Sequence, residues 1–183
     1  VTIPLTLAGI GGAESGDLDI TQPMTITGAM KGFPANFSEL PRIEASFAER
    51  LFDIGQGVAV TFRSMRMAGG APSGGAGTNG GALRITASGA SVLVDRVRFL
   101  ENTAATGAAI SNSGTLVVEG SDFFINIATT AASAIQTNAS GNTTLRGSSI
   151  REIRNDGVTR EGLRVLQGGT LIVEHSFIDG ASQ

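Results

Sequence analysis

Short apolar stretches recur along the chain about every 25 to 31 residues, with the same order of apolar and polar positions. The recurring stretches are SVLVDRVRF (91–99), TLVVEGSDF (115–123), TTLRGSSI (143–150) and TLIVEHSFI (170–178). Aligned, they form two apolar columns five positions apart: Val94, Val118, Leu145 and Val173, then Phe99, Phe123, Ile150 and Ile178. An earlier copy, VAVTFRSM (58–65), is expected to add Val60 and Met65 to these columns. A repeat of this length predicts a chain that stacks one structural unit on the next.

A second short apolar motif precedes each of these stretches and is separated from it by a glycine-containing turn. Its copies are LDI (18–20), FDI (52–54), LRI (83–85), ISN (110–112), IQT (135–137) and LRV (163–165). Apolar and polar residues alternate in both motifs, which indicates β-strands with one face inward. We therefore expect each unit to contain two or three short strands joined by turns.

The fold predicted from this pattern is a right-handed parallel β-helix, an all-β solenoid of about six coils. A β-propeller needs four strands per blade and a period of roughly 40 to 50 residues. A sandwich would not keep one column apolar over five units. Further inward positions are expected at Val58, Val92, Leu116, Thr143 and Leu171, with Met24 and Ile26 extending the columns into the first coil.

We expect one domain over residues 1–183. Its first part, 1–50, is predicted to be an irregular first coil with a loop at 30–42. Regular coils are predicted over 51–183, with a glycine-rich loop at 68–81. The best helix candidate, 37–52, contains Pro41, which interrupts a helix.

Composition fits a turn-rich β protein and excludes several functional classes. The 183 residues include 26 glycines, and charged residues make up only 16%. The net charge of −3 argues against a nucleic-acid partner, which favours a basic surface. No stretch is long and apolar enough for a membrane span. Cysteine is absent, which excludes disulfides and thiolate metal sites.

Three aspartates form the best candidate metal site. Asp19 and Asp53 occupy one column of the LDI-type strands, followed there by Arg84, and Asp17 lies on the same face as Asp19. Clustered carboxylates repel one another unless a cation or an arginine compensates them. Calcium accepts such oxygen ligands. The sequence thus leaves two alternatives, a calcium site or a solvated surface beside Arg84, and no other cofactor is expected.

Other outward positions are expected to be structural. The column Thr61, Asp95, Glu119, Arg146 and Glu174 predicts a row of salt bridges. Asn102 and Asn126 each end an F-x-x-N unit, FLEN (99–102) and FFIN (123–126), and we expect their amides to stack and hydrogen-bond along the rod.

The two ends of the chain lack recognisable caps. The chain starts at Val1 without an initiator Met or signal peptide and ends shortly after Ile178. Repeat proteins need capped ends to stay soluble, so we expect a processed or longer chain, or pairing end to end. The partners would then be other copies of this chain or neighbouring coils of a longer one. Open contacts of that kind generate filaments.

The units GGAL (80–83) and GAAI (107–110), each followed by F-x-x-N about sixteen residues later, resemble the GGA[ILV]/FxxN repeats of polymorphic outer-membrane proteins. Residues 7–29 and 50–62 are also similar to the start of large bacterial extracellular β-helix proteins associated with a CSLREP motif. Beyond residue 132 the pattern departs, because Ile153 stands where Asn102 and Asn126 stand. The resemblance implies a bacterial, secreted or surface-displayed β-helix that is structural or adhesive, with no catalytic residues.

The alternatives are a non-catalytic glycan binder, with Asp17, Asp19 and Asp53 as its polar patch, and a polysaccharide lyase or hydrolase. The enzyme is disfavoured, because Lys31 falls in a loop and Tyr and Trp, which stack on sugars, are absent. Arg96 and Arg98 are expected to pair with Asp122 at the rim. We therefore predict a non-enzymatic module, and a glycan or a host surface is the further partner that this prediction allows.

Overall fold

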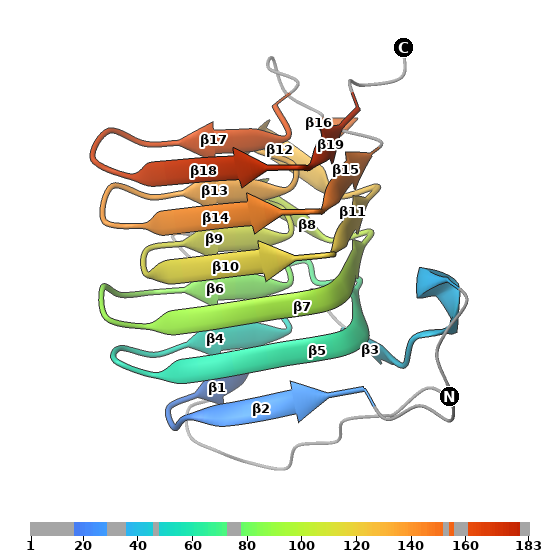
Figure 1. Cartoon of the computed structure of the whole chain (residues 1–183), viewed down its shortest axis with the longest axis horizontal. Coiled ribbons are helices and arrows are strands. Elements are labelled where there is room, and N and C mark those ends of the chain that lie inside the picture. Colours follow the sequence, from blue (N-terminus) through green and yellow to red (C-terminus); the bar gives the residue numbers. More distant parts are fainter. Residues whose placement is uncertain are drawn as a thin grey trace.

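The computed structural model describes residues 17–28, 36–45, 48–72, 78–151, 154–155 and 161–179. The described chain winds into a parallel β-solenoid in which each coil lies on the previous one (Figure 1). Every paired strand runs parallel to its neighbours, and the described part contains only one short helical segment, the 3-10 turn η1 (Phe37–Glu39). The predicted fold class is therefore confirmed.

The LDI-type motifs form a six-stranded sheet. Its strands, in sheet order, are β1 (Leu18–Ile20), β4 (Phe52–Ile54), β6 (Leu83–Ile85), β9 (Ile110–Asn112), β13 (Ile135–Thr137) and β17 (Leu163–Val165). Each strand coincides with a motif read from the sequence. The solenoid has about four turns, slightly fewer than the six coils predicted. β1 and β17 form the two edges of this sheet.

The long apolar stretches form a ten-stranded sheet that bends partway along each coil (Figure 1). Before the bend lie β2 (Met24–Thr27), β10 (Thr115–Glu119), β14 (Asn142–Arg146) and β18 (Thr170–Glu174). After the bend lie β3 (Arg42–Glu44), β11 (Asp122–Phe124), β15 (Ser149–Arg151) and β19 (Phe177–Ile178). In two coils a single strand continues through the bend: β5 (Ala59–Ala68) and β7 (Ser91–Leu100).

A third sheet has three strands, β8 (Thr103–Thr106), β12 (Ile127–Ala131) and β16 (Arg154–Asn155). The loops expected at 30–42 and 68–81 lie partly outside the described residues. Pro41 does separate η1 from β3, as its position in the sequence suggested.

The bend of the ten-stranded sheet coincides with one backbone position in each coil from β5 onward. Ser64, Arg96, Gly120, Gly147 and His175 occupy this position, and all have φ between 46° and 53°. The left-handed conformation turns the chain sharply, and non-glycine residues adopt it only at a cost. His175 thus lies in the bend of the last coil.

Apolar columns fill the interior. Val94, Val118 and Leu145 are paired in consecutive coils and fully buried, as are Phe99, Phe123 and Ile150. The rings of Phe99 and Phe123 stack, with centroids 4.8 Å apart. Burying a side chain of this size contributes roughly 1.5–3 kcal/mol, so the columns supply much of the stability.

The alignment predicted for β5 was wrong by two residues. Val60 pairs with Val92 rather than Val94, and Met65 pairs with Val97 rather than Phe99. Phe62 and Met67 take the places that had been assigned to Val60 and Met65. A two-residue shift keeps every side chain on its own face. The alternating pattern of β5 therefore could not distinguish the two alignments.

The same shift corrects two further columns. Val58 precedes β5 and is not the partner of Val92. The outward column before the bend contains Arg63, not Thr61, because Arg63 pairs with Asp95 while Thr61 pairs with Leu93. Met24 and Ile26 do extend the inward columns, through their pairing with Val60 and Phe62.

The two asparagines form the expected ladder, but they are buried inside the molecule and not at the outward positions expected from the sequence. Asn102 is fully buried, and its Nδ2 donates to Asn126 Oδ1 at 2.9 Å and to the Met67 carbonyl at 3.1 Å. Its Oδ1 accepts from the Gly70 amide. Asn126 Nδ2 donates to the Phe99 carbonyl one coil earlier. Ile153, where the sequence departs from this pattern, lies outside the described residues.

Candidate functional site

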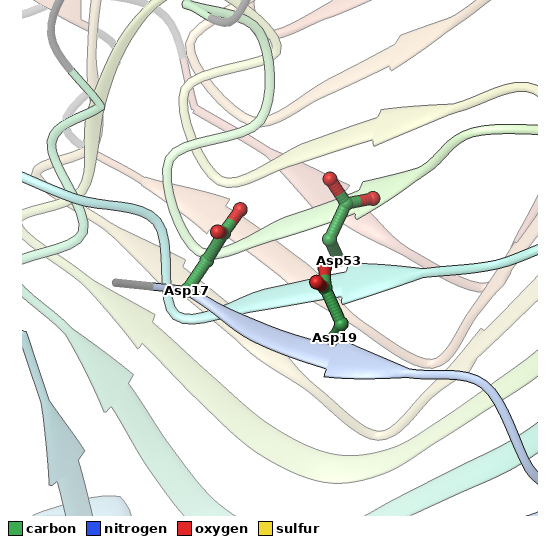
Figure 2. A group of neighbouring side chains, drawn as sticks. All are labelled: Asp17, Asp19 and Asp53. Carbon is green, nitrogen blue, oxygen red and sulfur yellow. The ribbon is translucent and has the colours of Figure 1, made fainter. Parts of the chain in front are cut away.

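The six-stranded sheet carries the candidate site on its outward column. Strand pairing places Asp19 beside Asp53, and Asp53 beside Arg84. Asp17 immediately precedes β1. Figure 2 shows the three aspartate side chains grouped on these two neighbouring strands. One carboxylate oxygen from each aspartate lies within 4.8 Å of the others. We call Asp17, Asp19 and Asp53 the aspartate cluster.

Arg50 contacts two members of this cluster, although no motif in the sequence indicated it. Its Nη1 lies 2.7 Å from Asp17 Oδ2 and 3.3 Å from Asp53 Oδ2. Its Nε donates to the Gly80 carbonyl at 2.8 Å. The side chains of Arg50 and Asp17 are only 4% and 2% exposed. Arg50 therefore joins three consecutive coils from inside the wall of the solenoid.

Arg84 supplies a second positive charge by bonding to Asp53 Oδ2. Burial, and then the repulsion of Arg84, lower the pKa of Arg50, while Asp53 and Asp17 oppose the shift. Within the described residues, Asp17 Oδ1 and Asp53 Oδ1 are buried without a hydrogen-bond partner. The two inner carboxylates thus depend on the guanidinium groups for compensation.

Asp19 differs from the other two aspartates. It is exposed, and no described residue forms a hydrogen bond or an ion pair with it. Burial raises its pKa above 3.8, and repulsion from Asp17 and Asp53 adds to the shift, while Arg84 and Arg50 oppose it. The aspartate cluster therefore has three carboxylates but, among the described residues, only two guanidinium partners, those of Arg50 and Arg84. The negative charge without a paired arginine lies on Asp19.

This arrangement fits calcium poorly. Calcium takes six to eight oxygen ligands, whereas two of the available carboxylate oxygens already accept from Arg50 and Arg84. Cationic groups inside the ligand set also repel a divalent ion. Of the two alternatives left by the sequence, the geometry favours compensation by arginine. The calcium site stays a prediction that a binding measurement can test.

The outward column before the bend carries alternating charges. Arg63 Nε lies 2.7 Å from Asp95 Oδ2, and Arg146 lies between Glu119 and Glu174, at 3.7 Å and 2.6 Å. The predicted row of salt bridges is present, with Arg63 in place of Thr61. These side chains are largely exposed, so each pair contributes about 1 kcal/mol or less.

A second charged group lies just after the bend, where Arg42, Arg66 and Arg98 are paired in consecutive coils. We call these three residues the arginine column. Asp122 follows Arg98 in the same column and bonds to it at 3.3 Å. Asp122 is fully buried, so this pair is not at a rim as predicted, and Arg96 pairs with Asp95 instead.

Arg66 stands out within the arginine column. Its Nε donates to the Leu40 carbonyl, and no described acidic side chain pairs with it. Burial, followed by repulsion from Arg42 and Arg98, lowers its pKa. Phe124 lies nearby and is half-buried between the guanidinium groups of Arg98 and Arg151, 4.8 Å and 5.4 Å from its centroid. Arg42 pairs with Glu44 at 2.6 Å, and Arg98 and Arg151 pair with Asp122, so arginines outnumber acidic side chains in this group by four to two.

Comparison of the chain with protein-family models, with curated proteins and with solved structures finds no match. The resemblance to extracellular β-helix repeats therefore stays a sequence-based prediction. No helix in the described ranges is long and apolar enough to cross a membrane.

Proposed function

We propose that this chain is a structural module of an extracellular or cell-surface assembly, in which solenoids stack end to end. The observation that carries the proposal is the distribution of exposed apolar side chains. All large exposed hydrophobic residues of the described part belong to the first or the last coil: Met24, Val165, Ile172, Val173, Phe177 and Ile178. Adhesive display along the sides of the rod would be compatible with the same assembly.

The strand edges add to this argument. β1 and β17 are edge strands of the six-stranded sheet, and β18 is an edge of the ten-stranded sheet. Edge strands present unpaired backbone amides and carbonyls, which readily pair with another chain. Stacking a further coil on either end would satisfy those groups and cover the apolar side chains together.

A non-enzymatic role is supported by the ion pairs that the buried aspartates form with arginines. Hydrolysis of glycosidic bonds needs an acid and a base or nucleophile, two carboxyl groups set about 5 to 10 Å apart across the bond. In the aspartate cluster, Asp17 and Asp53 are held by Arg50 and Arg84. Asp122 is held by Arg98 and Arg151. These contacts leave the buried carboxylates engaged with guanidinium groups.

The test is negative-stain electron microscopy of the purified chain over a range of concentrations, combined with sedimentation velocity. We expect rods that lengthen with concentration and have an axial repeat of one solenoid. Short rods of constant length at all concentrations would contradict assembly by this chain and would favour a segment of a longer protein.

Binding of an anionic polymer is a second candidate function, favoured by the arginine column. Neighbouring strands of a parallel sheet lie roughly 4.8 Å apart, so the backbone positions of the arginine column repeat at that interval and suit a partner with regularly repeated anionic groups. The glycan-binding patch would then be the arginine column rather than the aspartate cluster, whose carboxylates repel acidic chains.

Affinity electrophoresis in gels containing polygalacturonate or heparin tests this second function. We expect retardation of the wild-type chain, and loss of most of it in Arg66→Gln. Arg96→Gln is the matched control, because it removes the same charge from an exposed position outside the column. Equal retardation of both variants would show a non-specific charge effect.

A further inference from the structure

The first and last coils present strands of the same three positions at opposite ends of the solenoid. The first coil contributes β1, β2 and β3, and the last contributes β17, β18 and β19 (Figure 1). Because neighbouring coils pair in parallel, the pairings connect most strand residues of the last coil with an equivalent strand residue of the first. If a second molecule continued the same register, these equivalent residues would become neighbours.

Following the six-stranded sheet links Asp19 with Arg164. The pairings run from Asp19 to Asp53 and Arg84, then through Ser111 and Gln136 to Arg164. Asp19 and Arg164 thus occupy one column at opposite ends. In a head-to-tail stack, the residue next to Arg164 would be Asp19 of the following molecule.

We propose that a second copy of this chain stacks head to tail in unbroken register, so that Arg164 of one molecule completes the aspartate cluster of the next. This inference rests on the proposed end-to-end assembly and specifies its joint. The partner is a copy of the same chain, because its own first coil supplies the matching column.

Charge complementarity is the first support. The aspartate cluster has three carboxylates and two arginines, Arg50 and Arg84. Its outermost member, Asp19, is exposed and has no partner among the described residues. Arg164 is also exposed, and no described acidic residue pairs with it. The joint would bring these two groups together and give equal numbers of positive and negative charges.

The apolar columns give independent support. In the ten-stranded sheet, Val173 belongs to the column of Ile26, and Leu171 to the column of Met24. Met24 and Val173 are each 42% exposed, although their equivalents in the middle coils are buried. After the bend, the exposed Ile178 belongs to the column of Ile43, which is already buried in the single chain. Unbroken register therefore places apolar residues in line with apolar residues in both parts of the sheet, and before the bend both partners, Met24 and Val173, are exposed.

Charge reversal on the full-length chain tests the joint. Arg164→Asp and Asp19→Arg each put like charges at every self-joint. We expect each variant to weaken self-association by at least about tenfold in sedimentation velocity, since facing like charges oppose association. Arg96→Asp is the matched control, because Arg96 is exposed on the side of the rod, and it should assemble like the wild type.

Mixing the two non-assembling variants provides the decisive result. In a stack that alternates the two variants, every joint brings together one arginine and one aspartate, in the wild-type order at one joint and in the reversed order at the next. The equimolar mixture should therefore form rods that neither variant forms alone. The double variant Asp19→Arg/Arg164→Asp should also assemble. Circular dichroism melts check that each variant is folded. If one is not, the milder pair Asp19→Asn and Arg164→Gln replaces it, with weakened association expected from each.

The outcomes separate this inference from the proposed function. A wild-type chain that stays monomeric would overturn both. Wild-type assembly that is unaffected by either charge reversal, or that the mixture fails to restore, would overturn the Asp19–Arg164 joint while leaving end-to-end assembly in place.

Discussion

At the scale of single residues, buried polar side chains join the coils where apolar packing alone would leave their alignment free. Arg50 contacts Asp17, Asp53 and the Gly80 carbonyl, which belong to three consecutive coils. Asn102 contacts Gly70, Met67 and Asn126 in the neighbouring coils. A shift between coils would leave these buried groups without partners, at a cost of about 1 to 3 kcal/mol each.

Neutralising Asp19 should stabilise the isolated chain. The folded state raises the pKa of Asp19 above 3.8, so it holds the proton more tightly than the unfolded chain does. The stability contributed by the protonated acid is therefore present at low pH and lost as the pH rises through the folded-state pKa. Near neutral pH we expect Asp19→Asn to raise Tm by about 1 to 3 °C, a small effect because the group is exposed.

Thermal unfolding over a pH series, at concentrations where the chain is monomeric, measures this effect. The advantage of Asp19→Asn should disappear below pH 3.8, where both side chains are neutral. Asp95→Asn serves as a control of opposite sign, since it removes the ion pair with Arg63. The same Asp19→Asn change should weaken head-to-tail association. A variant with a higher Tm as a monomer but weaker self-association would show that Asp19 acts at the joint and not only on the stability of its own chain.

Replacing Asn102 should destabilise the fold strongly. Asn102→Leu keeps a similar branched shape but removes the acceptor of the Gly70 amide, the donor to the Met67 carbonyl and one of the two donors to Asn126 Oδ1, which keeps its bond from the backbone amide of residue 102. Unsatisfied buried groups of this kind cost about 1 to 3 kcal/mol each, so we expect a loss of about 3 kcal/mol or more by urea unfolding. A double-mutant cycle with Asn126→Leu should show strong coupling; additive losses would contradict a shared ladder.

At the scale of the strand, alternation determines the face of each side chain, and stacking determines its neighbour. β7 and β10 pair Val92 with Leu116 and Val94 with Val118 without a gap. β5 follows the same alternation with Phe62 and Met67 in the apolar columns. β5 and β7 each carry four inward apolar residues, and alternation is unchanged by a two-residue shift, so the alignment of β5 had to come from its pairing with β7.

The stacked phenylalanines provide the clearest test at this scale. Phe123 is buried on Phe99, whereas the next residue, Phe124, points outward and is half-buried. We expect Phe123→Ala to cost about 3 to 5 kcal/mol and Phe124→Ala clearly less, because only contacts with Arg98 and Arg151 are lost. Urea unfolding of the two variants gives the comparison, and equal losses would contradict the assigned faces.

At the scale of the whole molecule, stability should be greatest in the middle coils. β9 and β10 have strands on both sides, whereas β17 and β18 are edge strands with exposed apolar residues. In repeat proteins each unit depends on its neighbours, so the end coils should open locally at lower free energy than global unfolding.

Hydrogen–deuterium exchange of the monomeric chain tests this gradient. We expect amides of β9 and β10 to exchange most slowly and those of β17 and β18 at least about tenfold faster, a difference of about 1.4 kcal/mol. Under conditions of assembly, protection of β17 and β18 should rise to that of the middle coils. Uniform exchange along the monomer would show a single cooperative unit.

Much of this architecture was predictable from the sequence, because strand alternation and a fixed period are local patterns. The six LDI-type strands, the columns from Val94 to Leu145 and from Phe99 to Ile150, and the pairing of Asp19, Asp53 and Arg84 were all predicted. The Asn102–Asn126 ladder was predicted in the same way. These features recur at equivalent positions of successive repeats, so aligning the repeats of the sequence is enough to reveal them.

By itself, the sequence determined the repeating strands and the class of fold. Tertiary structure decided the alignment of β5, the role of Arg50 and the isolation of Asp19. The alignment of β5 was ambiguous by two residues because such a shift leaves both faces unchanged. Arg50 lies 33 residues from Asp17, outside any repeated column, and only the winding of the chain brings the two side chains to 2.7 Å. Contacts that do not repeat have no periodic signal, so they become visible only when the coils are stacked.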